Sequence, residues 1–136
     1  MTNAHRIKTT PDPFEPFKLA QGYRIGDLIL LSGQAAITKE GEIVGADDFD
    51  AQAAQTFANI RELLELAGSG LDKVVKVTVY LTDMANFPKV IALREKYFTP
   101  PYPADTIVEV SALALPELMI EIDVMALAKG KIVDAE

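Results

Sequence analysis

Two charged side chains stand where the local pattern of the sequence predicts apolar ones. Arg94 falls near the middle of an apolar arc when residues 87–98 are placed on a helical wheel at about 100° per residue. Glu121 lies between Ile120 and Ile122 in the most apolar strand-like run of the chain. Functional sites are a frequent cause of such departures, because a site needs polar groups that packing alone would not place there.

Each of these two residues predicts a particular chemistry. A guanidinium aimed inward needs a carboxylate from the protein or from a ligand; the alternative is an arginine that extends along its helix to water. A carboxylate in an apolar strand is either paired or has a raised pKa and can move protons. The alternative is a residue on a solvated face, and Asp123 and Glu109 have the same two interpretations.

The residue types that the chain lacks exclude several kinds of site. There is no cysteine among the 136 residues, so a disulfide, a thiolate nucleophile and a thiolate metal site are all excluded. The single histidine, His5, lies in a polar N-terminal segment without a nucleophile motif. We predict that His5 is a solvated residue with no catalytic or metal-binding role, and we expect neither a metal nor a cofactor.

The charge balance narrows the class of partner. Thirteen basic and 20 acidic residues give a net charge of -7, which argues against a nucleic-acid backbone or an anionic membrane surface. A small anion stays possible, because one local cation can hold one. No apolar run approaches the roughly 20 residues of a membrane span. The first residues contain no apolar signal segment, so the expected location is the cytoplasm.

The length predicts one domain over residues 1–136, with two helices. Three prolines within residues 10–17 predict an extended lead-in over residues 1–17 that forms neither a helix nor a central strand. Residues 129–136 are predicted to be a polar tail. Apolar residues at spacings of three and four predict a first helix that Asp48 or Asp50 caps and Gly68 ends. The second helix is predicted to begin at a capping Asn86, end near Phe98 and be stopped by Pro100-Pro101.

The remaining regular segments predict strands. They cover residues 18–24, 28–32, 73–82, 105–110 and 118–127. The order predicts an α+β domain in which two helices pack on one face of a mixed sheet. The other face would then expose apolar strands, and the continuous apolar run at 28–32 is typical of a sheet covered on both faces. We therefore expect this face to be covered by oligomerisation.

Several segments, in their order and spacing, resemble the Rid family, also called YjgF or endoribonuclease L-PSP. They are Leu31-Ser32-Gly33-Gln34, Gly41-Glu42-Ile43-Val44-Gly45, residues 74–84, Pro103-Ala104 with residues 106–110, and Ile120-Glu121-Ile122. The resemblance covers roughly Phe17 to Leu127. It implies a chorismate-mutase-like fold and a homotrimer whose sheets form a central barrel. It also implies three small-molecule clefts at the subunit interfaces.

The resemblance also implies an activity and a set of site residues. The best-known members of the family hydrolyse reactive enamines and imines to 2-oxo acids and release ammonia. In them an Arg holds the substrate carboxylate by a two-pronged ion pair, and a Glu positions or activates the attacking water. Glu121 matches that Glu. The residues expected to bind substrate are Leu19, Ser32, Gly33, Gln34, Ile91, Arg94, Thr106 and Ile107.

Four positions depart from the family pattern. The usual Arg is Asp105, a Tyr of the cleft is Leu19, an Asn on the second helix is Ile91, and an occasional Cys is Ile107. A carboxylate at position 105 would repel a substrate carboxylate about 4 Å away by about 4 kcal/mol at an effective dielectric of about 20. A repulsion of that size lowers the affinity for the substrate carboxylate roughly a thousandfold. We therefore expect the specificity to differ from that of a 2-imino-acid deaminase.

Three functions remain open at this point. In the first, which the sequence favours, Asp105 and Glu121 form an acidic pair that acts as acid and base on a cationic or neutral amine, imine or amide. In the second, Arg94 supplies the missing cation, either paired with Asp105 or in direct contact with a ligand carboxylate. In the third, the trimer binds a metabolite or a protein and catalyses nothing. The family is also linked to translation inhibition and RNA cleavage, and the acidic charge makes direct RNA cleavage the least favoured activity.

Overall fold

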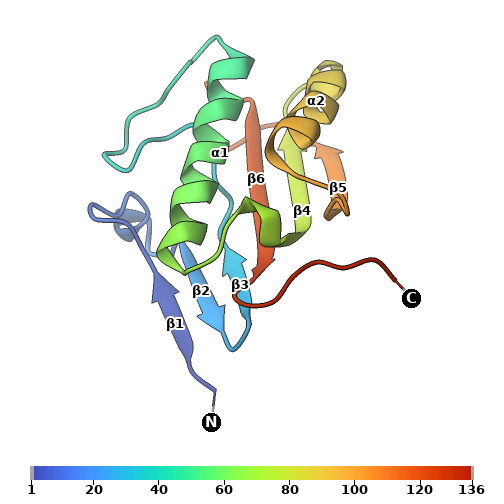
Figure 1. Ribbon diagram of the computed structural model, residues 1–136. Helices are drawn as coiled ribbons and strands as arrows, with labels where there is room; N and C mark the ends of the chain where they lie inside the picture. Colours follow the sequence, from blue (N-terminus) through green and yellow to red (C-terminus); the bar gives the residue numbers. More distant parts are fainter. Residues whose placement is uncertain (1, 136) are drawn as a thin grey trace.

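The computed structural model describes residues 2–135 and places two α-helices on one face of a six-stranded sheet (Figure 1). The strand order is β1-β2-β3-β6-β4-β5. β4 and β5 run parallel and all other neighbours are antiparallel. The predicted α+β architecture with a mixed sheet is therefore confirmed. The elements are β1 (Ala4–Ile7), β2 (Gly22–Ile25), β3 (Leu28–Leu31), α1 (Phe49–Leu66), β4 (Val74–Leu81), α2 (Phe87–Tyr97), β5 (Ala104–Glu109) and β6 (Ile120–Leu127).

The first helix forms as its sequence predicts. Asp48 is the N-cap, and its side chain accepts a hydrogen bond of 3.1 Å from the backbone N–H of Ala51. The residues that α1 buries recur at spacings of three and four and face the sheet. The apolar ones are Phe49, Ala53, Phe57, Ile60, Leu63 and Leu64, and Gln52 and Thr56 are buried with them. Gly68 has a φ of +80°, which a side-chain-bearing residue adopts only with strain, so the helix ends there.

The sheet has one covered and one open face. In β6 the side chains of Ile120, Ile122, Val124 and Ala126 are buried under the helices, and the alternate residues are only half-buried on the other face. On that open face Tyr23, Ile25 and Val108 are 37–40% exposed. In β3 only Ile29 and Leu31 are buried. Within a single chain, therefore, this strand is covered on one face.

A buried glutamine fixes the segment that leads into β6. Gln52 of α1 has no exposed surface. Its Nε2 donates to the carbonyl oxygens of Gly45 and Glu117, at 2.9 and 2.7 Å, and its Oε1 accepts from the backbone N–H of Met119 at 2.8 Å. One side chain thus joins α1, the loop before it and the two residues on either side of Leu118. This clamp holds the start of β6, where Glu121 lies.

The structure differs from the sequence predictions, or adds to them, at three points. Residues 1–17 contain the edge strand β1 and a 3-10 turn at Glu15–Phe17, although no strand or helical turn was predicted there. The strand was missed because only Ile7 of its four side chains is buried, so the segment lacks an apolar alternation. The turn forms because Pro is tolerated at the start of a helical segment. Asn86 occupies the N-cap of α2 but makes no capping bond; Asp83 caps the preceding 3-10 turn instead, accepting from Ala85.

Within residues 2–135, none of the helices has the length and apolar character needed to cross a membrane.

Candidate functional site

A cavity of about 410 Å³ lies beside the beginning of β6. Its walls come from the proline-rich lead-in, the segment after β3, the middle of α1 and the loop before β6. The lining includes Phe17, Leu19, Gly33, Gln34, Ile37, Lys39, Asn59, Glu62, Ala114, Leu115, Leu118 and Glu121. Four of the sequence-predicted site residues, Leu19, Gly33, Gln34 and Glu121, are therefore brought together in one place.

Glu121 lies directly against the backbone of Gly33. A Cβ atom at position 33 would collide with the carboxylate of Glu121. Glycine thus permits the close approach of the Glu121 carboxylate, and a larger residue would have to displace it. The carboxylate makes no hydrogen bond or ion pair to any of the residues 2–135, so it is available to a ligand or to water.

Burial raises the pKa of the Glu121 carboxyl, and the negative charge of Asp123 raises it further. Asp123 itself accepts a hydrogen bond of 3.0 Å from the hydroxyl of Tyr80, which raises the pKa of that tyrosine. Glu109 accepts from the backbone N–H of Met84 at 2.8 Å. Asp123 and Glu109 thus have partners within the chain, and of these three carboxylates Glu121 is the one that lines the cavity.

The raised pKa makes a prediction about stability. A carboxyl whose pKa is higher in the folded protein contributes stability below its unfolded pKa of about 4.3, and this contribution is lost as the pH rises through the folded pKa. Glu121→Gln is therefore expected to raise the melting temperature at pH 8. The difference should shrink towards zero as the pH falls below about 4. Thermal unfolding across this pH range tests it, with the exposed Glu95→Gln as the control; a Glu121→Gln protein less stable than the wild type at pH 8 contradicts it.

The second predicted site residue, Arg94, pairs with Asp105. Its Nε donates to Asp105 Oδ2 at 3.0 Å, and the two side chains are 27% and 16% exposed. The guanidinium carbon also lies 5.9 Å from the ring centroid of Phe87, two helical turns earlier in α2. Arg94 therefore points inward, and its partner is the Asp105 carboxylate of the same chain. Asp105 Oδ1 is buried and has no hydrogen-bond partner within residues 2–135.

The register of the sheet separates Asp105 from Glu121. Asp105 is paired across the ladder with Val77, and Glu121 with Tyr80. Paired residues project from the same face of a sheet, and residues three apart in a strand project from opposite faces. The side chains of Asp105 and Glu121 therefore leave the sheet on opposite faces, and the cavity at Glu121 includes neither Asp105 nor Arg94. Within one chain the two carboxylates form no pair.

Of the other predicted residues, Ser32 lies beside the Glu121 cavity, Ile91 and Ile107 lie near the Arg94–Asp105 pair, and Thr106 is part of neither. The Oγ of Ser32, beside the cavity, donates to the carbonyl of Ala20 at 2.6 Å. Ile91 is 45% exposed on α2, one turn before Arg94. Ile107 is half-buried and packs on the core, two residues after Asp105. Thr106 lies on the open face, where its hydroxyl accepts from Lys76 Nζ at 3.0 Å.

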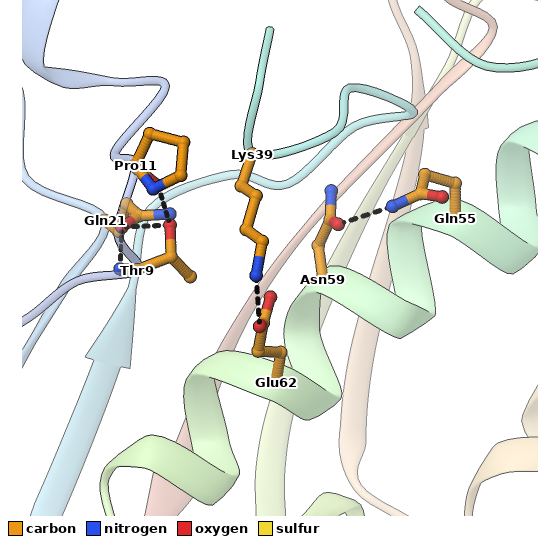
Figure 2. Close-up of polar contacts among 7 residues, drawn as sticks. All are labelled: Thr9, Pro11, Gln21, Lys39, Gln55, Asn59 and Glu62. Carbon is orange, nitrogen blue, oxygen red and sulfur yellow. Dashed lines mark hydrogen bonds and ion pairs between the residues drawn. The ribbon is translucent and has the colours of Figure 1, made fainter. Parts of the chain in front are cut away.

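Sequence reasoning missed the polar residues of the cavity wall. Figure 2 shows Lys39 facing Glu62 of α1, and Asn59 accepting a hydrogen bond from Gln55. Lys39 Nζ lies 3.5 Å from Glu62 Oε2. These residues are polar positions of a loop and of an amphipathic helix, which an ordinary solvated surface would also show. No signal in the sequence distinguishes them from surface residues.

Among residues 2–135 there is no cluster of three or more His, Cys, Asp or Glu side chains arranged to hold a metal ion.

Comparison with known proteins gives a consistent set of relatives. The family model described as endoribonuclease L-PSP matches residues 8–128. A RutC family protein of Pyrococcus horikoshii is 40% identical over 120 residues, 88% of this chain and 92% of its own. The 2-iminobutanoate/2-iminopropanoate deaminase of Salmonella typhimurium is 31% identical over 132 residues, 95% of this chain and all of its own. The crystal structure of RidA from a Psychrobacter species has a TM-score of 0.82 at 32% identity, covering 90% of this chain and 98% of its own.

Proposed function

Because this chain belongs to the endoribonuclease L-PSP family, which includes the Rid proteins, we propose that it hydrolyses the C–N bond of a small imine, enamine or related amine. Glu121 positions and deprotonates the attacking water. A general base needs hydrogen-bond reach to that water and a pKa near the working pH. The half-buried carboxylate of Glu121, open to a cavity and with its pKa raised, supports this role.

The active assembly in this proposal is a homotrimer with clefts between its subunits. The open face of the sheet exposes Tyr23, Ile25 and Val108, which an interface would cover. Asp105 and Glu121 leave the sheet on opposite faces, so they can face one another only across a boundary between copies. A cleft that joins the Glu121 cavity of one copy to the α2 and β5 surface of the next satisfies both observations.

The pair of Arg94 and Asp105 carries the proposed specificity. A guanidinium free of protein partners would bind a substrate carboxylate through two parallel hydrogen bonds. Here Asp105 already accepts from Arg94, so the pair has no net charge and offers a carboxylate little attraction. The repulsion expected from an isolated Asp105 is also largely cancelled. We therefore expect an uncharged substrate to be preferred over a 2-imino acid.

The alternative function is a trimer that binds a metabolite or a protein without catalysis. Position 105 holds Asp where the resemblance implies an Arg, and this departure favours the alternative. Measurements of melting temperature and of turnover distinguish this binding function from the hydrolase. A binding trimer raises its melting temperature with a ligand but shows no turnover. Direct cleavage of RNA remains the least favoured activity, because the chain carries a net charge of -7.

Mixing two inactive variants tests the shared cleft. Glu121→Gln removes the base, and Ile91→Trp fills the α2 side of the cleft from an exposed position. If each cleft takes Glu121 from one copy and α2 from the next, a mixed trimer always contains one cleft with both sides intact. Unfolding and refolding the two variants together in equal amounts is expected to restore about a quarter of the wild-type rate of imine hydrolysis.

The control for this experiment is each variant refolded alone. Size-exclusion chromatography before and after mixing shows whether trimers have formed and exchanged. If the mixed trimers form but stay as inactive as the separate variants, the two sides of the cleft belong to the same chain and the shared cleft is wrong.

A further inference from the structure

The cavity at Glu121 is larger than a small imine needs. It holds about 410 Å³. By comparison, an apolar cavity of about 150 Å³ in another protein accepts benzene. The relatives named for 2-iminobutanoate and 2-iminopropanoate act on substrates whose substituents are one or two carbons long. A substituent of that size would leave most of this cavity to water.

Several polar side chains of the cavity wall have at least one partner within the chain. Asn59 Nδ2 donates to the carbonyl oxygens of Ala35 and Ile37, at 3.0 and 2.8 Å. Gln21 Oε1 accepts from the backbone N–H of Thr9 at 2.6 Å, as Figure 2 shows. Gln34 Nε2 donates to the carbonyl of Ser32 at 3.0 Å. Lys39 and Glu62 neutralise each other at the rim. Much of the hydrogen-bonding capacity of the wall is therefore already used within the chain, while Gln21 Nε2 and Gln34 Oε1 have no partner within residues 2–135.

The rest of the wall is apolar. Phe17, Leu19, Ile37, Leu115 and Leu118 line the space that leads away from Glu121. In the single chain Phe17 and Leu19 are 77% and 45% exposed, so their apolar surfaces are open to an apolar ligand or to a neighbouring copy. Glu121 is the one charged group of the wall that lacks an ion-pair partner within residues 2–135. An unpaired carboxylate and an apolar surface therefore lie side by side in one cavity.

We propose that this cavity binds a bulky, uncharged apolar substituent of the substrate, of about five carbons or an aromatic ring, while Glu121 acts on the adjoining C–N bond. The proposal rests on the hydrolase function and specifies its substrate class. It predicts that affinity rises with the length of the apolar substituent. Burying each further methylene is expected to strengthen binding about threefold to fourfold.

Stable carboxamides test the proposal without turnover. Propanamide and hexanamide present the same amide group to Glu121 and differ by three methylenes. NMR titration of the full-length protein is expected to show hexanamide binding about 30- to 60-fold more tightly. Equal affinities for the two amides overturn the proposal.

A matched pair of variants tests whether the apolar chain of hexanamide binds in this cavity. Ala114 is exposed and lines the cavity, whereas Ala112 is exposed nearby and does not. Ala114→Phe is expected to remove at least tenfold of the hexanamide affinity and leave propanamide unchanged, because the ring takes the space of the longer chain. Ala112→Phe should bind both amides as the wild type does. If Ala114→Phe binds hexanamide as tightly as Ala112→Phe, the substituent lies elsewhere and the proposal fails.

The amide titrations separate this proposal from the hydrolase function. Tight hexanamide binding without hydrolysis of any imine supports the cavity and refutes the enzyme. Hydrolysis of imines with the same kcat/KM for ethyl and pentyl substituents supports the enzyme and refutes the cavity as a substituent site.

Discussion

Glu121→Gln is expected to lower kcat for imine hydrolysis by about 10²- to 10⁴-fold, because glutamine cannot take a proton from the attacking water. The amide has nearly the shape of the carboxyl and fits the same space against Gly33. The wild-type rate should rise with pH as Glu121 loses its proton, with a midpoint above the usual range of a glutamate because burial raises the pKa of Glu121. The variant should lose this pH dependence.

The control for this prediction is Asp123→Asn, the neighbouring carboxylate on the open face of the sheet. Asp123 is hydrogen-bonded to Tyr80 and is absent from the cavity wall. Its loss should lower the pH midpoint by removing a negative charge, while most of the turnover is kept. Measurement of kcat against pH for the wild type, Glu121→Gln and Asp123→Asn tests whether Glu121 is the general base. A Glu121→Gln enzyme with wild-type kcat would remove Glu121 from the mechanism.

Gln52→Leu is expected to destabilise the fold by about 3–5 kcal/mol, the largest effect on stability that we predict. The leucine fills the space but leaves the carbonyls of Gly45 and Glu117 and the N–H of Met119 without partners. Each unpaired buried backbone group costs about 1–3 kcal/mol. The segment that carries Leu118 and leads to Glu121 loses its anchor at the same time.

Gln55→Leu on the same helix is the matched control. Gln55 is half-buried and donates one hydrogen bond, to Asn59 at 2.7 Å. Its replacement should cost about 1 kcal/mol or less. Urea unfolding of both variants gives the comparison. If Gln52→Leu unfolds at the same urea concentration as Gln55→Leu, the three backbone partners of Gln52 are satisfied in another way.

The elements that could be predicted from the sequence are those whose signal is local. The capping Asp48 and the buried apolar face of α1 lie within one continuous segment, so a helical wheel describes them fully. The alternation in β6 predicts its buried face for the same reason. The strand β1 has no such signal, because backbone pairing with β2 holds it and three of its four side chains are exposed.

The candidate site could be predicted only in part. The helical wheel left two alternatives for Arg94, an inward contact with a carboxylate or an extension along the helix to water. The structure has the first, and the carboxylate is Asp105, 11 residues away on a different element. The cavity at Glu121 could not be predicted, because its walls join residues as distant as Leu19, Asn59 and Leu115. The separation of Asp105 from Glu121 depends on the register of three strands, which the spacing of residues along the chain does not reveal.

Imine hydrolysis by the wild-type protein, with and without a substrate carboxylate, tests the central claim most directly. 2-Iminobutanoate is generated in place from its amino acid by an amino-acid oxidase, and an uncharged imine with a phenyl substituent from a primary amine by an amine oxidase. Ammonia release above the spontaneous rate is measured for each. We predict Glu121-dependent acceleration of the uncharged imine, with kcat/KM at least about tenfold above that for 2-iminobutanoate, because Asp105 already occupies Arg94. Acceleration of neither imine, or preference for 2-iminobutanoate, would contradict this account.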